Sequence, residues 1–277
     1  MEVIKTIKEM QRLHPSLAKP LGLVPTMGFL HQGHLALIRQ AKEDNASVVV
    51  SIFVNPTQFA PGEDYERYPR DIQNDLVELE KIGVDVVFTP SRGEMYPHGF
   101  NSRVEVDRLT SRLEGASRPG HFSGVTTVVT KLFNIIQPQR AYFGQKDAQQ
   151  VAVIKKMVLD LNMDIRIISL PTVREPDGLA LSSRNSYLNP KERQAALILY
   201  QSLALAKKLY RQGEKDAARL RGEMVRLIRK EPLATIDYVN ITDAETLEEL
   251  EGIKPPALVS LAVKIGETRL IDNVILG

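Results

Sequence analysis

Short apolar runs, rich in β-branched residues, alternate with segments of helical period along the first two thirds of the chain. Uninterrupted apolar runs of this length are typical of strands that are buried on both faces of a parallel sheet. Between the runs, apolar residues recur at the three- and four-residue spacing of one helical face. The alternation predicts the α/β class, with a doubly wound, Rossmann-like parallel sheet whose ligands bind beyond the carboxyl ends of the strands. The predicted strands are Leu21 to Val24, Ser47 to Val54, Val84 to Phe88, Ala141 to Phe143 and Asp164 to Leu170.

The last third of the chain has a different pattern. Charged sequence rich in Ala and Leu predicts helix from Pro190 to Lys230, with a break near Gly213. Strand-like pieces follow, DYVNIT, LVSLAV and TRLIDNVIL, the last of them after a predicted turn at Gly266. We therefore expect a Rossmann-like domain over residues 1–176 and a smaller α+β domain over residues 177–277. The boundary is expected where Pro, Asp and Gly interrupt the periodicity.

Composition and charge narrow the possible functions. The 277 residues include 36 basic and 34 acidic side chains, a balance without the positive excess of a dedicated nucleic-acid binder. Cysteine is absent, which excludes disulfides and thiolate metal sites and fits a reducing compartment. No apolar run is long enough to span a bilayer, and the first twenty residues lack a hydrophobic signal core. We expect a cytoplasmic protein with no membrane or nucleic-acid partner, acting on a small ligand.

The stretch PTMGFLHQGHLALI places two histidines, His31 and His34, where the first predicted strand turns into a helix expected over His34 to Asn45. Unpaired N–H groups and the helix dipole attract anions there, and glycine lets the backbone approach a phosphate. Imidazole N–H groups can follow charge that develops on an α-phosphate during displacement. A structural pair and a zinc site are the alternatives, but no third metal ligand lies nearby in the sequence. Phosphate chemistry is the favoured interpretation.

A second candidate, YFGQKDAQQ, also follows a predicted strand. Gly144 permits close approach, Lys146 offers a point charge for phosphate, and Gln150 lies one turn further along the helix. The alternative is an ordinary helix start that Asp147 caps. The motif gains weight because it lies at the same edge of the predicted sheet as the histidines.

A third candidate, LSSRN, lies at the predicted domain boundary. The hydroxyls of Ser182 and Ser183 and the guanidinium of Arg184 could close over a triphosphate, and boundary loops can act as hinged lids. A polar loop between domains is the alternative.

Two further stretches offer polar side chains: one carries two uncharged amides, and the other an arginine and a histidine. FVNPTQF places Asn55 and Gln58 just past the second strand, where amides in an apolar pocket can hold a hydroxyl or a carboxylate. SRPGHFSGVTTVV places Arg118 and His121 before a helix rich in β-branched residues. An Asn-Pro turn and tight packing at Gly124 are the respective alternatives.

These five stretches, in this order and spacing, resemble the pantothenate synthetase (pantoate–β-alanine ligase) family, within the nucleotidyltransferase superfamily that includes class I aminoacyl-tRNA synthetases. The resemblance runs from about Pro25 to Asn189, with a weaker match in DYVNITD. It implies a two-step reaction on one enzyme, with Mg²⁺ and ATP as requirements. The carboxylate of pantoate attacks the α-phosphate of ATP to give pantoyl adenylate and pyrophosphate, and the amine of β-alanine then releases AMP and pantothenate. The resemblance also implies a homodimer, a first domain that binds ATP and pantoate, and a second that acts as a lid.

Roles carry over position by position. The resemblance implies that His34 is a proton donor and that His31, Lys146 and Arg184 act on the phosphates. It implies that pantoate is held by Gln58 and Gln150, with Gln58 also near β-alanine and Tyr68 at the amine end. Asn55, Arg118 and His121, which were singled out from the residues above, are expected to be further substrate contacts. The implied ATP contacts are Met27, Gly28, Gly33, His34, Gly144, Gln145, Lys146, Asp147, Val173 through its backbone, Leu181, Ser182, Ser183 and Arg184.

Some positions depart from the family pattern. Gln145 stands where glutamate is usual, Ala148 where an aromatic residue is common and Leu181 where methionine is typical. Asn74 replaces a frequent aspartate and leaves the partner of the β-alanine amine open. Two other functions also stay open: a nucleotidyltransferase that keeps the nucleotidyl group in its product, and a nucleotide-binding module without turnover.

Overall fold

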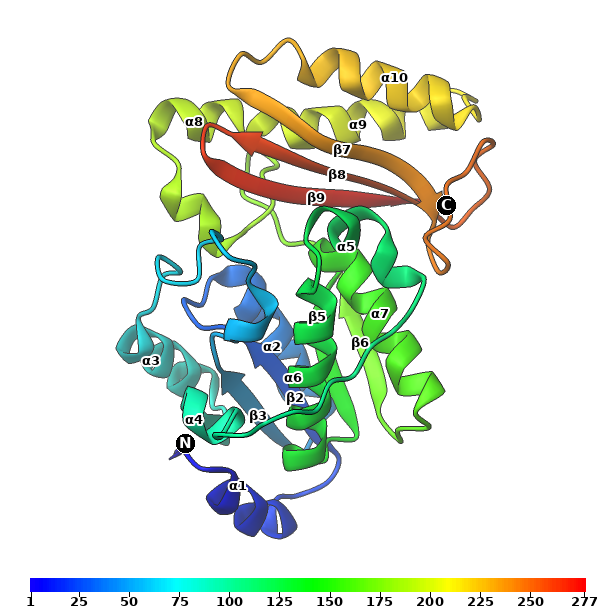
Figure 1. Cartoon of the computed structure of the whole chain (residues 1–277). Helices are drawn as coiled ribbons and strands as arrows, with labels where there is room; N and C mark the ends of the chain where they lie inside the picture. The colour runs from blue at the N-terminus through cyan, green and yellow to red at the C-terminus, as the bar shows by residue number, and fades with distance from the viewer.

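Two sheets form the framework of the molecule in a computed structural model that describes residues 1–277 (Figure 1). The larger sheet has six strands in the order β1-β4-β3-β2-β5-β6, and every neighbouring pair is parallel. The predicted doubly wound sheet is therefore confirmed. Strand β1 was not predicted, because it is an edge strand in which only Ile4 is buried, so it lacks the apolar run of the other strands. The strands are β1 Glu2–Ile4, β2 Leu21–Thr26, β3 Ser47–Ile52, β4 Val86–Phe88, β5 Arg140–Gly144 and β6 Arg166–Leu170.

Helices cover both faces of this sheet. Alternate strand residues separate the two cores: Leu23 and Phe143 pack with α1, α6 and α7, whereas Val24 and Tyr142 pack with α2 and α3. A sheet buried on both faces explains why its strands read as continuous apolar runs. The helices are α1 Ile7–Leu13, α2 Gln32–Asp44, α3 Ile72–Ile82, α4 Arg92–Met95, α5 Leu113–Ser117, α6 His121–Ile136 and α7 Ala148–Asp160. Short 3₁₀ turns are η1 His14–Ser16, η2 Pro56–Gln58, η3 Leu109–Ser111, η4 Gln145–Asp147 and η5 Ser183–Tyr187.

Strand β2 marks the point at which the winding direction reverses. It pairs with β3 on one side and with β5 on the other, so the loops that follow β2 and β5 leave in opposite directions. In open α/β sheets this reversal opens a crevice at the carboxyl ends, where ligands bind. The loop after β2 carries both histidines and the loop after β5 carries Lys146.

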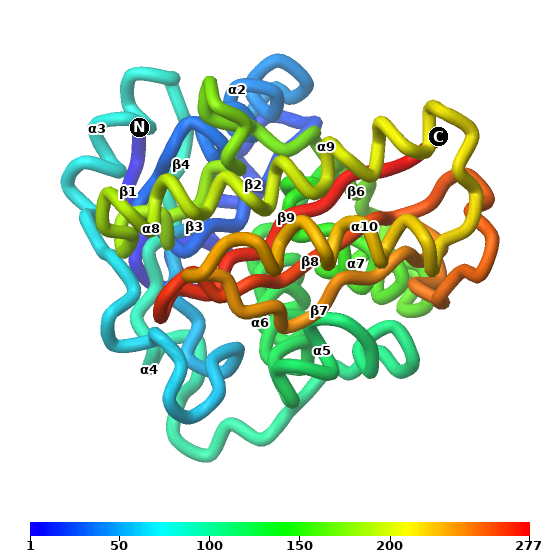
Figure 2. Tube along the Cα trace, turned by 90° about the horizontal axis from the view of Figure 1, so that it is seen from above, coloured from blue at the N-terminus to red at the C-terminus, as the bar shows by residue number.

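The smaller sheet lies across the carboxyl ends of the parallel strands, as Figure 2 shows from above. Its three antiparallel strands run in the order β7-β8-β9, and α9 and α10 cover the face that points away from the parallel sheet (Figure 1). The α+β pattern and the helix break near Gly213 are thus confirmed; a second break at Ala196 separates α8 from α9. None of the helices combines the length and apolar character that crossing a bilayer requires. The elements are α8 Pro190–Ala195, α9 Leu197–Arg211, α10 Ala217–Ile228, β7 Ala234–Asp243, β8 Ala257–Ile265 and β9 Thr268–Leu276.

Helix α6 packs unusually close to the η2 turn. A Cβ added to Gly124 would lie 2.3 Å from the carbonyl oxygen of Thr57, so only glycine allows this approach. The amide of Asn55 also donates to the carbonyl of Gly124 at 3.1 Å. The tight-packing alternative for Gly124 is therefore correct, and the contact fixes the position of Gln58 at the end of η2.

We expect Gly124→Ala to destabilise the protein by about 1–3 kcal/mol, because the added methyl overpacks against backbone that cannot move cheaply. Gly222→Ala is the matched control, since Gly222 is an exposed position of helix α10 and nothing lies within 4 Å of the Cβ added there. That change should stabilise by about 0.5–1 kcal/mol through helix propensity. Urea denaturation of both variants measures the difference, and equal stabilities would contradict the packing argument.

Candidate active site

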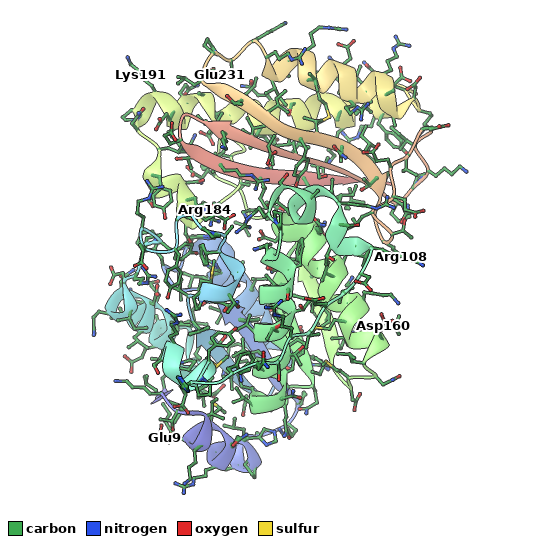
Figure 3. The ribbon with its side chains drawn as sticks, in the orientation of Figure 1. Glu9, Arg108, Asp160, Arg184, Lys191 and Glu231 are labelled. Carbon is green, nitrogen blue, oxygen red and sulfur yellow. The ribbon has the colours of Figure 1, made fainter.

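A cleft of about 1200 Å³ lies between the carboxyl edge of the parallel sheet and the antiparallel sheet. All five loops singled out in the sequence contribute to its lining. Figure 3 shows Arg184 in the region between the two sheets, whereas Glu9, Asp160 and Glu231 extend at the periphery. Two residues expected to touch ATP, Gly28 and Gln145, do not line the cleft. The predicted residues that do are Met27, His31, Gly33, His34, Asn55, Gln58, Tyr68, Arg118, His121, Gly144, Lys146, Asp147, Gln150, Val173, Leu181, Ser182, Ser183 and Arg184.

The two histidines cap helix α2. His31 is the N-cap residue and its Nδ1 accepts the backbone N–H of Gly33 at 3.1 Å, while Nδ1 of His34 accepts the N–H of His31 at 3.3 Å. The helix therefore begins at Gln32, two residues before the predicted start. Because both Nδ1 atoms accept hydrogen bonds, each neutral ring carries its proton on Nε2. Capping does not exclude ligand binding, because it uses only the Nδ1 atom of each ring and leaves Nε2 without a capping role.

Burial keeps both imidazoles uncharged. Desolvation, and then the charge of Lys146, lower the pKa of His31 from 6.5 to about 4. Burial lowers the pKa of His34 well below its ordinary value, and His31 and Lys146 contribute in the same direction. The ring centroids lie 4.0 Å apart. At neutral pH the pair thus presents two neutral N–H donors side by side to any ligand in the cleft.

The turn before these histidines depends on a carboxylate that the sequence did not reveal. Gly28 and Phe29 both have positive φ, 80° and 51°, and this conformation is unfavourable for phenylalanine. Asp75 of α3 accepts the N–H groups of Phe29 and Leu30 at 2.8 and 2.7 Å. Burial raises the pKa of Asp75 above its ordinary value, although the two N–H groups act in the opposite direction. These charge-assisted bonds offset the strain of the turn.

The loop after β5 is held from the second sheet. The side-chain amide of Asn273, in β9, donates to the carbonyls of Gln145 and Lys146 at 2.9 and 2.8 Å. The amide of Gln145 donates to Asn273 at 3.3 Å, so a protein partner occupies this side chain, which does not line the cleft. Asp147 makes no capping bond and instead lies 3.3 Å from Nζ of Lys146, so the capping alternative is wrong. No local signal predicts Asn273, because its partners lie more than one hundred residues away.

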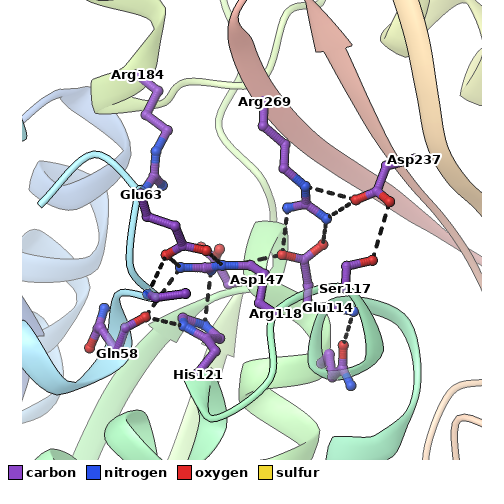
Figure 4. A network of polar contacts seen from close by, with 12 residues as sticks. Gln58, Glu63, Glu114, Ser117, Arg118, His121, Asp147, Arg184, Asp237 and Arg269 are labelled. Carbon is purple, nitrogen blue, oxygen red and sulfur yellow. Dashed lines mark hydrogen bonds and ion pairs between the residues drawn. The ribbon is translucent and has the colours of Figure 1, made fainter.

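A network of ion pairs surrounds Gln58 at the other end of the cleft (Figure 4). The carbonyl of Gln58 lies 3.2 Å from Nη2 of Arg118 and 2.8 Å from Nδ1 of His121. Glu63 accepts two bonds from Arg118, at 2.7 and 2.6 Å. Burial, and then Arg118, lower the pKa of His121 to about 4. Arg118 and His121 thus act on the backbone of Gln58, and Asn55 is occupied by protein partners.

The same network reaches the antiparallel sheet. Arg269 of β9 donates to both carboxylate oxygens of Glu114, at 2.7 and 2.8 Å, and to Asp237 of β7 at 2.6 and 2.9 Å (Figure 4). Tyr238 also donates to Glu114 at 2.9 Å. Since Glu114 is 7% exposed, its bonds to Arg269 and Tyr238 are shielded from solvent and hold the second sheet over the first domain.

The loop from Leu181 to Arg184 closes the remaining side. The N–H of Leu181 donates to the carbonyl of Val173 at 3.0 Å, and the hydroxyl of Ser183 donates to the carbonyl of Phe29 at 3.3 Å. The loop therefore lies directly on the turn that precedes the histidines. Ser182 caps η5 through the N–H of Arg184.

Comparisons with known proteins agree with one another. A family model described as Pantoate-beta-alanine ligase matches residues 2–275. The pantothenate synthetase of Thermotoga petrophila is 57% identical over 100% of both chains, and that of Acetivibrio thermocellus is 58% identical over 99% of both. The crystal structure of pantothenate synthetase from Thermus thermophilus has a TM-score of 0.96 at 47% identity, over 99% of both chains. A pantoate-beta-alanine ligase from Francisella tularensis, complexed with beta-gamma ATP and beta-alanine, has a TM-score of 0.82 at 39% identity, over 99% of this chain and 97% of that one.

We expect Asp75→Asn to destabilise the protein by about 1–3 kcal/mol, because Phe29 and Leu30 bind different carboxylate oxygens and an NH₂ group in place of one oxygen leaves a backbone N–H unpaired. The freed turn should also displace the histidines and lower the turnover number. Glu78→Gln on the same helix is the control, since its exposed pair with Lys81 is worth about 0.5 kcal/mol or less. Thermal unfolding measures the stability of both variants, and steady-state assays measure their turnover numbers. Equal stability and equal turnover in the two variants would contradict the role of Asp75.

NMR titration of the imidazole signals should give His31 a pKa of about 4 in the ligand-free protein. The unfolded chain binds this proton near pH 6.5, so the folded state should lose stability as the pH falls from about 6.5 toward 4. Adding ATP should raise the pKa of His31 more than that of His121, since phosphate charge favours the imidazolium. If the pKa of His31 does not change when ATP binds, the phosphates do not lie near the His31 ring.

Proposed function

The chain belongs to the pantoate–β-alanine ligase family, and from this premise we infer that it condenses pantoate with β-alanine at the expense of ATP. The products are pantothenate, AMP and pyrophosphate. The observation that carries the proposal is that His31, His34, Lys146 and Arg184 line the same cleft as the amide of Gln58. Donors suited to phosphate therefore share one cavity with an uncharged group suited to a hydroxy acid.

The first step forms an acyl adenylate. The carboxylate of pantoate attacks the α-phosphate, the bond to the β-phosphate breaks, and pyrophosphate leaves. The Nε2–H groups of His31 and His34 donate to oxygen atoms on which negative charge accumulates. The low pKa of His34 supports hydrogen-bond donation by a neutral ring in place of the proton transfer that the resemblance assigns to it. Lys146 and Arg184 neutralise the charge of the phosphates.

Mg²⁺ enters as part of the substrate, MgATP. Magnesium retains several water ligands and is commonly held through substrate phosphates with only one or two carboxylates. Asp147, beside Lys146, is the carboxylate of the β5 loop that lines the cleft.

The second step uses the other end of the cleft. Gln58 and Gln150 bind pantoate without adding a charge that competes with its carboxylate. The neutral amine of β-alanine attacks the acyl carbon of the adenylate, AMP leaves with the electron pair of the broken carbon–oxygen bond, and the new amide nitrogen releases one proton to solvent. Tyr68, 6% exposed in the cleft wall, is the side chain we assign to the amine end.

Three further assignments extend the expectations from the sequence, and of these the homodimer rests on the resemblance alone. Residues 1–176 form the domain that binds ATP and pantoate, and residues 177–277 form the lid. The protein acts in the cytoplasm as a homodimer, and sedimentation equilibrium measures that assembly directly.

Isotope exchange between ATP and pyrophosphate, with pantoate present and β-alanine omitted, tests the function. Exchange is expected, because a reversible adenylation needs only the acid and the nucleotide. Exchange that does not depend on pantoate, or a product that retains the nucleotidyl group, would contradict the proposal in favour of another nucleotidyltransferase. Binding of ATP without exchange would indicate a module without turnover.

We expect His34→Ala to slow this exchange by about 100- to 1000-fold, the effect of removing one positioned donor from a charge-stabilising site. His14→Ala is the control, because His14 lies in the η1 turn, outside the cleft lining. Exchange at the normal rate in a folded His34→Ala protein would remove this residue from the mechanism.

A further inference from the structure

Two adjacent carboxylates lie on the segment that joins η2 to α3, and each binds a different arginine. We call residues 59–70 the strap. Glu63 binds Arg118, which lies just before α6, and Asp64 binds Arg184 from the loop between the two sheets. The strap thus contacts both the acid end and the phosphate end of the cleft.

The bond between Asp64 and Arg184 has a specific geometry. Nε donates to Oδ2 and Nη2 donates to Oδ1, both at 2.8 Å, so the carboxylate contacts the side of the guanidinium. The Tyr187 hydroxyl lies 3.3 Å from Oδ2, and the centre of the Tyr68 ring lies 5.8 Å from the guanidinium carbon. The Asp64 side chain is 13% exposed. Burial opposes ionisation, but the bonds from Arg184 lower the pKa of Asp64, so it stays charged at neutral pH.

This geometry leaves the other edge of Arg184 available. A guanidinium has five N–H donors, and the side-on pair uses one on Nε and one on Nη2. The two donors of Nη1 and the second donor of Nη2 remain, and they form the planar fork that binds two oxygens of a phosphate. A long, flexible side chain that is already oriented loses less entropy when its ligand arrives. Asp64 therefore need not leave Arg184 when a triphosphate binds.

We propose that Asp64 is a positioning residue for formation of the adenylate: it aims the free fork of Arg184 at the β- and γ-phosphates. The proposal rests on the proposed function, since it assigns a role within the same reaction. It confines that role to the first step, because pyrophosphate has left before the amine attacks. Glu63 cannot substitute for Asp64, because its two oxygens bind Arg118.

Asp64→Asn tests the proposal, with Glu66→Gln as the matched control. Glu66 is an exposed carboxylate of the same strap whose side chain makes no ion pair, so the control removes an equal charge. Two half-reactions are measured: pyrophosphate exchange with ATP and pantoate, and release of AMP when chemically prepared pantoyl adenylate meets β-alanine. We expect Asp64→Asn to lower kcat/KM for ATP in the exchange by about 10- to 100-fold, the usual effect of a misplaced contact group. The second half-reaction should stay within about twofold of the unchanged protein, as should both half-reactions of Glu66→Gln.

A double variant shows whether Asp64 acts through Arg184. If it does, adding Asp64→Asn to Arg184→Ala should cause no further loss beyond about twofold, because the group to be positioned is gone. If the loss in the double variant is the product of the two single losses, Asp64 acts independently of Arg184 and the proposal is overturned. Equal losses of Asp64→Asn in both half-reactions would also overturn it, because they indicate a structural role. Tighter ATP binding by Asp64→Asn would show that Asp64 competes with phosphate and would also overturn it.

Asp64→Glu decides the matter if the asparagine variant does not fold. It keeps the carboxylate but moves it by one methylene, so the exchange alone should slow by a smaller factor. Loss confined to the exchange supports the proposal, and unchanged rates in both half-reactions contradict it. Absence of pantoate-dependent exchange in the unchanged protein would instead refute the proposed function, so the two failures are distinguishable.

Discussion

The bond between Asp75 and the backbone of Phe29 and Leu30 is the interaction on which the rest of the site depends. A parallel strand that ends at a winding reversal must turn sharply into its helix, and two residues of this turn adopt positive φ. The buried carboxylate compensates for that strain with two charge-assisted bonds. With the turn fixed, His31 reaches the N-cap and both Nδ1 atoms accept backbone N–H groups. Burial of the two rings then lowers their pKa values and keeps both imidazoles neutral at neutral pH.

The antiparallel sheet is part of the same site and not only a cover. Asn273 holds the carbonyls of the loop that carries Lys146, and Arg269 joins the sheet to Glu114 beside the acid end. Arg174 adds a third link through two bonds to Asp272, at 2.6 and 2.9 Å. Each link pairs a charged or amide side chain with a buried partner, where removal of one member is costly. The geometry of the cleft is thus a joint property of both sheets.

The sequence predicted the parts that depend on local pattern. Apolar runs revealed strands β2 to β6, and the order of strands and helices located the carboxyl edge that carries His31 and Lys146 and faces the cleft. It did not predict Asp75, Asp64 or Asn273, because each acts on a segment far away in the chain. The sequence around each of these polar residues contains no motif that predicts a contact with a distant segment. Gln145 is a residue for which the motif was misleading. It was expected to touch the nucleotide, but its amide donates to Asn273 of β9.

The hairpin turn at Gly266 sets which side chains of β9 reach the cleft. Ile265 pairs with Thr268 across this turn, and alternate residues of the strand then point to opposite faces. Leu270 faces the core under α9 and α10, whereas Arg269 and Asn273 face the parallel sheet. Slippage of the strand by a single residue would exchange these faces, because its side chains alternate with a period of two. The turn has no catalytic group of its own, but it fixes the register of β9 and therefore decides that Arg269 and Asn273 face the cleft.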